Sequence, residues 1–307
     1  MRAAGCAAML FAWVTTMLSF APEGVQLEMK NVLLHVDDGI VLDVARLRGT
    51  MVGRDEKTPV FDDQRSFVVH LQSADVAMDM VSLQNLMNRH VFAYQGSPLK
   101  ELTLEPDGPR LKMKGKLHKG VDIPFSTTAT VSATPGGLMR LHVESMKAVG
   151  VPAKGLLDLF GLKLDDLIDL KKRRGVDVQN DDIILAAAQL LPPPEMVGRL
   201  TRVSVQGNRL VQTFGDPKQN RPAPLKLPAP SARNYVYFGG GMITFGKLTM
   251  RDADLQLIDS DPSDPFDFFP ARYDAQLVAG YSKNTPEKGL KTYMPDFGDL
   301  QKPTRKQ

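Results

Sequence analysis

The densest group of carboxylates in the sequence is a loop in which four aspartates are interspersed with prolines. These aspartates are Asp259, Asp261, Asp264 and Asp267. Calcium prefers several carboxylate oxygens, and a typical calcium loop has a glycine at its sixth position and a glutamate at its twelfth. Here the glycine is missing and the twelfth position is Pro270. We therefore interpret the loop as a solvated turn and predict no metal site, with a loose divalent-cation site as the alternative.

The five histidines are too scattered for the zinc site in which two imidazoles share one helical face. They are His35, His70, His90, His118 and His142. The sequence has no Gly-x-Ser-x-Gly turn of the kind that carries the nucleophile in many hydrolases. The glycine run at 239–241 lacks the lysine and hydroxyl residue of a phosphate-binding loop. We predict a protein that is not an enzyme, with no catalytic residues and no cofactor.

The first 21 residues have the composition of a secretory signal. One charge, Arg2, precedes an uncharged stretch over residues 3–20, and Ser19-Phe20-Ala21 is a small-x-small cleavage site. Pro22 follows that site directly and the apolar run is nearly long enough to span a bilayer, so a retained anchor over residues 3–21 is the alternative. The only cysteine, Cys6, lies in this segment, which leaves the mature chain without disulfides. We expect an exported protein of the periplasm or cell envelope.

The charge balance argues against a nucleic-acid partner. Lys and Arg total 38 and Asp and Glu total 35, which is far from the strongly basic balance of nucleic-acid-binding domains. The dense basic cluster at 171–174 ends a segment with helical periodicity, where cations complement the helix dipole. The same cluster is suited to anionic lipid headgroups, so a membrane surface is a second candidate partner.

Apolar and polar residues alternate in paired runs separated by short turns, which is typical of antiparallel hairpins. The paired runs are 32–36 with 40–44, 99–104 with 111–115, 125–131 with 138–143, and 203–205 with 210–214. Each turn is too short for a parallel crossover. Further strands are expected at 235–238, 242–250, 255–258 and 273–278. The sequence therefore predicts a long antiparallel sheet.

Two segments have a helical period instead. In the first, Ser82 is the expected N-cap of a helix that runs toward Val91. The second covers residues 153–172 and has one broad apolar stripe. The apolar faces of the two helices contain Leu83, Leu86, Met87, Leu156, Phe160, Leu164 and Leu167. Together with the strands, they predict an α+β fold in which amphipathic helices lie on a sheet.

Prolines divide the chain into regions. Residues 216–234 contain five prolines and read as an extended linker or strap. We expect a signal or anchor at 1–21, an α+β domain at 22–215, and a β-rich C-terminal extension at 235–307. Methionine is abundant, with 15 in the chain. Its flexible thioether suits either ordinary core filling or a plastic cavity for acyl chains.

Four segments, in their order along the chain, point to a known family: Ser73-Ala74-Asp75-Val76-Ala77-Met78, Leu83-Gln84-Asn85-Leu86-Met87-Asn88, Gly198-Arg199-Leu200-Thr201 and Leu210-Val211-Gln212-Thr213-Phe214. With the order of strands and helices, they resemble the LmeA-like phospholipid-binding family of the tubular lipid-binding (TULIP) superfamily. The resemblance covers residues 24–215. It implies a strongly curved antiparallel sheet wrapped around a long helix, with a groove or tunnel for acyl chains.

Three functions are consistent with these sequence features. The first is an exported carrier that holds phospholipid or other acyl chains against the helix residues named above. The second is a structural or scaffolding envelope protein whose core is filled by its own side chains. The third is a lipid or glycan hydrolase, which needs a serine or a carboxylate pair to converge on a histidine in the cavity. We expect the first function, and a continuous apolar cavity is the feature that separates it from the second.

Overall fold

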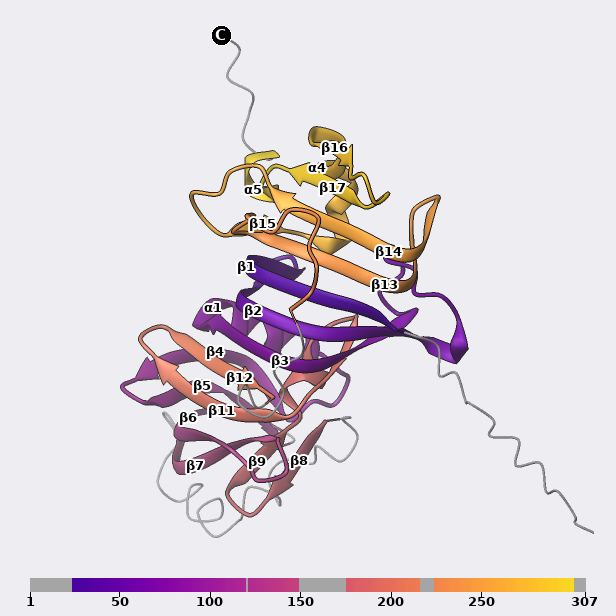
Figure 1. Cartoon of the computed structure of the whole chain (residues 1–307). Coiled ribbons are helices and arrows are strands. Elements are labelled where there is room, and N and C mark those ends of the chain that lie inside the picture. The colour runs from indigo at the N-terminus through magenta and orange to yellow at the C-terminus, as the bar shows by residue number, and fades with distance from the viewer. Residues whose placement is uncertain (1–23, 120, 149–174, 216–223, 301–307) are drawn as a thin grey trace, which may run out of the picture.

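The computed structural model describes residues 24–119, 121–148, 175–215 and 224–300. Within these ranges the chain is mostly β-strand with a few short helices, which confirms the predicted β-rich α+β class. The strands form two sheets, one of 11 strands and one of six. In Figure 1 the larger sheet crosses the upper and middle parts of the molecule, and the smaller sheet lies at the lower end.

The first three strands form the middle of the larger sheet. β1 (Val25–Asp37), β2 (Ile40–Gly53) and β3 (Phe67–Asp79) are consecutive antiparallel neighbours. Gly39 has a φ of +70° in the tight turn between β1 and β2, a conformation that glycine adopts without a side-chain clash. The predicted first hairpin is therefore confirmed. A 3₁₀ turn, η1 (Arg54–Glu56), follows β2.

Later segments extend the sheet beyond β3. β10 (Glu195–Val197) pairs in parallel with the first half of β3, and β12 (Arg209–Phe214) pairs antiparallel with its second half. β11 (Leu200–Gln206) pairs with β12, which confirms another predicted hairpin. β3 thus pairs with two segments that lie more than a hundred residues later in the chain.

The C-terminal strands extend the sheet on its other side. β13 (Tyr235–Phe245) pairs antiparallel with β1, and β14 (Leu248–Asp259) follows it as a hairpin. β17 (Leu290–Met294) lies parallel to β14, and β16 (Tyr281–Asn284) forms the edge. β15 (Phe266–Phe268) pairs in parallel with β1. The segment expected as a β-rich extension therefore continues the sheet that begins with β1.

The expectation of a purely antiparallel sheet is wrong for the larger sheet. β10 with β3, β15 with β1, and β17 with β14 are parallel pairs. None of these pairs is a hairpin, because each joins segments that are separated by other elements of the chain. Hairpin turns constrain only the strands that they connect directly. The sequence pattern therefore predicted the local pairs but not these distant ones.

Two further expectations for the C-terminal segment are wrong. The glycine run at 239–241 does not separate two strands but lies within β13, where Gly240 and Gly241 have φ values of +67° and +60°. Glycine lets a strand bend at such an irregularity without ending. Residues 273–278 form a helix, α4 (Tyr273–Ala279), and not a strand. Its buried residues, Tyr273 and Gln276, have the three-residue spacing of one helical face.

The smaller sheet is antiparallel throughout. Its strands, in spatial order, are β4 (Leu99–Asp107), β5 (Arg110–Lys119), β6 (Val121–Ala133), β7 (Met139–Ala148), β9 (Asp182–Leu185) and β8 (Val176–Gln179). The hairpins β4–β5 and β6–β7 are the two that the sequence predicts in this region. A 3₁₀ turn, η3 (Ala187–Leu190), follows β9. The turn before β7 contacts the larger sheet, because the Leu200 backbone N–H donates to the Gly137 carbonyl at 2.9 Å.

The first helix packs against strands of both sheets. α1 (Met80–Leu86) contacts β2, β3 and β12 of the larger sheet and β4 of the smaller one, and continues as a π-helical turn, η2 (Met87–Val91). Its N-cap is Asp79, which accepts a hydrogen bond from the Ser82 backbone N–H at 2.6 Å, so the predicted cap at Ser82 is wrong. The Ser82 hydroxyl instead accepts from the Val41 backbone N–H of β2. Because Asp79 caps the helix, the Ser82 hydroxyl is available for this hydrogen bond, which connects the helix to the sheet.

Aromatic side chains join the C-terminal strands to the core. Phe238, Phe266 and Phe268 are among the largest fully buried side chains of the described ranges. Phe61, from the loop before β3, lies with its ring centroid 5.5 Å from that of Phe238 and 4.6 Å from that of Phe245. The C-terminal helices α4 and α5 (Phe297–Leu300) cover this end, together with the 3₁₀ turn η4 (Pro270–Arg272).

Candidate functional site

An apolar cavity lies between the two sheets. Its wall is formed by β2, β3, β10 and β12 of the larger sheet, by β4, β5, β7 and β9 of the smaller one, and by α1, η2 and η3. The cavity has a volume of about 90 Å³. That is several times the volume that one water needs, yet apolar cavities stay dry and bind apolar molecules. The site is therefore suited to hydrocarbon.

Three of the residues predicted to line an apolar groove do line this cavity. Leu83, Leu86 and Met87 share one face of α1 and the start of η2. Leu83 and Leu86 are buried, with 6% and 3% of their surface exposed. The remaining predicted residues lie outside the described ranges and are Leu156, Phe160, Leu164 and Leu167.

The polar face of the same helix explains why its apolar face meets the cavity. The Asn88 side-chain amide donates to the Leu102 carbonyl at 2.7 Å, and its oxygen accepts from the Leu102 N–H at 2.9 Å. Gln84 accepts from the Leu104 N–H, and Asn85 donates to the carbonyl of the β1–β2 turn. These amides attach the helix to β4 and to the first hairpin. The direction of the leucine stripe is thereby fixed toward the interior.

One lining residue that sequence reasoning did not select is polar. Gln212 of β12 has only 7% of its surface exposed and faces the cavity between Leu210 and Phe214, which also line it. None of the hydrogen bonds of the described residues involves its side-chain amide, whose atoms are not sealed off from the cavity. The other lining residues of the described ranges are alanine, valine, leucine, isoleucine, methionine or phenylalanine. Its position in the alternation of β12 is the signal by which the sequence places it on the inner face.

Four of the five histidines pair with aspartates at separate places. His35 and Asp267 lie 2.5 Å apart at Nε2 and Oδ1, and the His35 ring stacks on Phe269. Burial favours a higher pKa for Asp267, but the His35 hydrogen bond, the charge of His35 and the Gly298 N–H together hold this pKa below its usual value. The other pairs are His90 with Asp37, His118 with Asp122, and His142 with Asp182. Of the four paired histidines, only His35 contacts the C-terminal helices.

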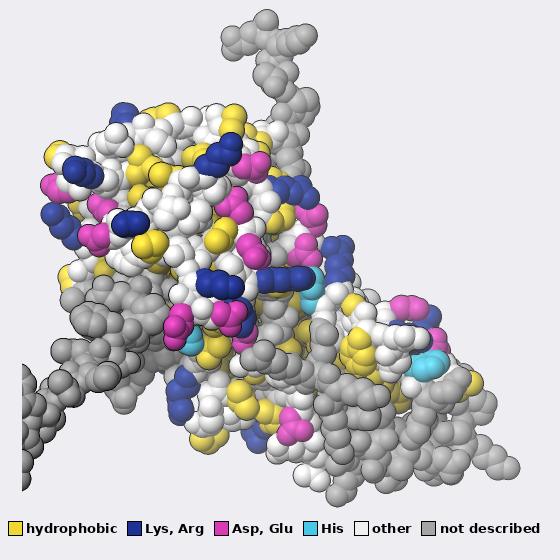
Figure 2. Space-filling view, turned by 90° about the vertical axis from the view of Figure 1, so that its right-hand side faces the viewer, with side chains coloured by type: hydrophobic (Ala, Val, Ile, Leu, Met, Phe, Trp, Pro, Cys, Tyr) yellow, Lys and Arg dark blue, Asp and Glu magenta, His cyan; other side chains and the backbone are white. Residues whose placement is uncertain are grey.

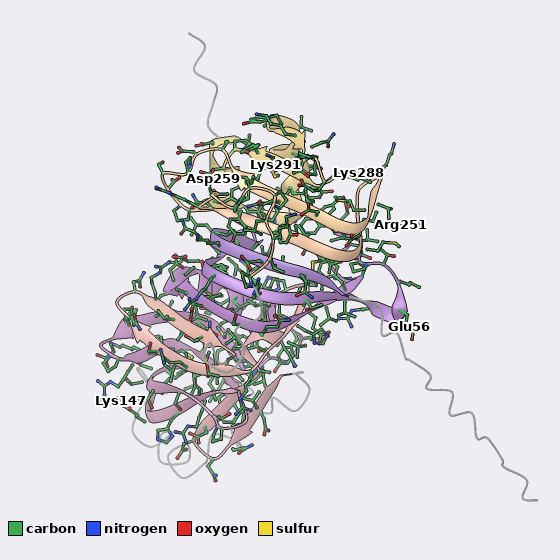
Figure 3. The ribbon with its side chains drawn as sticks, viewed as in Figure 1. Glu56, Lys147, Arg251, Asp259, Lys288 and Lys291 are labelled. Carbon is green, nitrogen blue, oxygen red and sulfur yellow. The ribbon has the colours of Figure 1, made fainter. Side chains whose placement is uncertain are left out.

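The acidic loop brings two of its four aspartates together with a third residue from elsewhere. Carboxylate oxygens of Asp259, Asp264 and Asp296 lie within 4.8 Å of one another. Asp259 is the last residue of β14 (Figure 3). Sequence spacing did not indicate Asp296. The Asp259 carboxylate already accepts from the Asn234 side chain at 2.9 Å. Burial, together with repulsion from neighbouring carboxylates, raises the pKa of Asp296 to about 7.

Asp296→Asn is expected to stabilise the protein at pH 8 and not at pH 4. A carboxyl whose pKa is about 7 when folded and 3.8 by default binds its proton more tightly when folded, so wild-type stability falls as pH rises from about 4 to about 7. The asparagine oxygen still accepts from the Asp267 N–H. After allowance for solvent screening, we expect about 1–2 kcal/mol of gain at pH 8. Urea unfolding at both pH values measures it.

The matched control is Asp274→Asn, an exposed carboxyl on α4. We expect this variant to follow the pH dependence of the wild type. Equal effects of Asp296→Asn at pH 4 and pH 8 would show that the Asp296 carboxyl does not titrate near neutrality.

On the face seen in Figure 2, the basic and acidic side chains of the described residues are interspersed and form no extended patch of one charge. Within the described ranges, no helix has the length and apolar character needed to cross a bilayer. No family model, curated protein or solved structure matches this chain, so the cavity itself is the basis for assigning a function.

Proposed function

We propose that this protein is an exported lipid-binding protein that holds acyl chains, such as those of a phospholipid, in the cavity between its two sheets. The observation that supports this function is the wall of the cavity. In the described ranges it contains no charged side chain and a single polar one, Gln212. Transfer of a hydrocarbon chain from water into such a cavity is favourable by about 0.8 kcal/mol for each buried CH₂ group.

The cavity wall is adaptable as well as apolar. Five of its side chains are methionines, namely Met78, Met87, Met113, Met139 and Met196. They come from both sheets and from η2, so they face the interior from several directions. Unbranched thioether side chains adjust to irregular apolar partners. This arrangement favours a ligand whose chains differ in length or unsaturation over one rigid ligand.

The architecture is compatible with a TULIP-like arrangement, which is part of the proposal. α1 packs between strands of the two sheets, and its leucines point into the cavity. In such a fold the acyl chains lie along the helix and the headgroup remains at the opening. The proposed function is the transport or sequestration of lipid in the cell envelope. It involves no catalytic step.

Met87→Trp is expected to lower the amount of co-purified lipid about tenfold, because a larger ring occupies the cavity that the chains need. The full chain is expressed with its first 21 residues and purified without detergent. Native mass spectrometry and lipid extraction then give the lipid bound per protein. Met250→Trp is the matched control, because Met250 is also partly buried against the core but does not line the cavity.

Two results would contradict the proposal. One is a folded wild-type protein that carries no lipid and takes up none from phospholipid vesicles, which would favour a scaffolding protein. The other is equal loss of lipid in Met87→Trp and Met250→Trp, which would trace the loss to general destabilisation and not to the cavity.

A further inference from the structure

The regular alternation of β12 places the side chain of Gln212, whose amide has no hydrogen-bond partner among the described residues, on the face toward the cavity. Its backbone pairs with Val76 of β3 and Val203 of β11, so the residue has a neighbouring strand on both sides. Leu210 and Phe214, two residues away on either side, face the same cavity. Aliphatic or aromatic residues would be expected at all three positions of such a strand. Gln212 therefore interrupts an otherwise apolar inner face.

An unpaired amide at this position has a cost in stability. Transfer of an amide out of water is unfavourable unless a hydrogen bond replaces those to water. The contrast within this protein is Gln276, which is fully buried and makes three hydrogen bonds, to the Phe269 N–H and to the carbonyls of Asp267 and Pro295. Gln212 has none to the described residues, and its side chain points into space that a ligand can occupy.

The chemistry of the missing partner is limited by the rest of the wall. No lysine, arginine or histidine of the described ranges lines the cavity. An ionised phosphate or carboxylate at this depth would lose its hydration without a compensating charge. An uncharged oxygen does not have this desolvation cost, and it can accept a hydrogen bond from the Gln212 NH₂ group.

We propose that Gln212 is the hydrogen-bonding subsite of the cavity and donates from Nε2 to the ester carbonyl of a bound acyl lipid. This inference rests on the proposed lipid-binding function and specifies its ligand class. Among the groups of an acyl lipid, the ester carbonyl is the uncharged acceptor that adjoins the chains. The ligand is thus an esterified lipid, whose ester enters the cavity while a charged headgroup stays outside it.

The test compares two phospholipids that differ only at this carbonyl. Full-length protein, stripped of lipid, is mixed with vesicles of a diester phosphatidylglycerol or of the diether with the same chains and headgroup. Native mass spectrometry measures the lipid bound. We expect the wild type to prefer the diester by about threefold to tenfold, the range given by one net hydrogen bond. Gln212→Met should bind both lipids within twofold of each other.

The control is Gln206→Met, the same chemical change at an exposed position of β11. This variant should keep the diester preference. Equal binding of the two lipids by the wild type would overturn the subsite while leaving the lipid-binding function in place. Binding of neither lipid would instead overturn the proposed function. The wild-type comparison decides the question even if Gln212→Met folds poorly.

Discussion

A chain that ends at Gly215 is expected to lose its cooperative unfolding transition and to self-associate. The missing strand β13 pairs with β1 between Gln26 and Lys30, so truncation leaves that edge of β1 without a partner. Unpaired, flat strand edges are templates for association between chains. The truncation also removes three of the largest fully buried side chains, Phe238, Phe266 and Phe268. Light scattering and urea unfolding followed by circular dichroism measure both effects.

Co-expression with residues 216–307 is the control for this truncation, because it restores the missing strands without a covalent bond. We expect a soluble complex with a cooperative transition. A monomeric, cooperatively folding 22–215 fragment that binds lipid would contradict this expectation. It would make the proline-rich segment at 216–234 a boundary between independent domains.

Gln276→Met is expected to lower the free energy of unfolding by about 3–5 kcal/mol. The substitution keeps the volume of the side chain but leaves the Phe269 N–H and the carbonyls of Asp267 and Pro295 without their partner. Buried backbone groups that lose a hydrogen bond incur their full desolvation cost. Urea denaturation of the lipid-free protein is the measurement.

Gln212→Met is the matched comparison, because it makes the same chemical change at another buried glutamine. Methionine there removes an amide that has no partner among the described residues, so the lipid-free variant should be at least as stable as the wild type. A drop of less than about 1 kcal/mol for Gln276→Met would contradict the importance of its three bonds.

The sequence predicted the parts of the fold that depend on neighbouring residues. The hairpins around Gly39, Gly108 and Gly207 have turn residues directly between alternating runs, and each is present. The apolar spacing of Leu83, Leu86 and Met87 likewise predicted a helix and its inner face. Both signals are local, because turn chemistry and side-chain periodicity act within a few residues.

Pairing between distant segments was not predictable in this way. Nothing in the sequence near β1 indicates that, besides β2, it pairs with β13 and β15. The helix at 273–279 was missed because its apolar residues also fit an alternating pattern over so short a stretch. Asp296 joins Asp259 only through tertiary structure. Gln212 was missed as a site residue because a lone glutamine in a strand is informative only once its surroundings are known.

The two sheets imply an order of folding. In the smaller sheet, β4, β5, β6 and β7 are neighbours in space in the same order as along the chain, so each pairing closes only a short loop. In the larger sheet, Tyr235 and its hydrogen-bond partner Glu28 are 207 positions apart. Because closing a long loop costs entropy before its contacts form, we expect the hairpins of the smaller sheet to form before β13 pairs with β1. The wall of the cavity is complete only when β10 and β12 pair with β3, so we expect the inner faces of a nascent chain to stay exposed until most of the chain has been made.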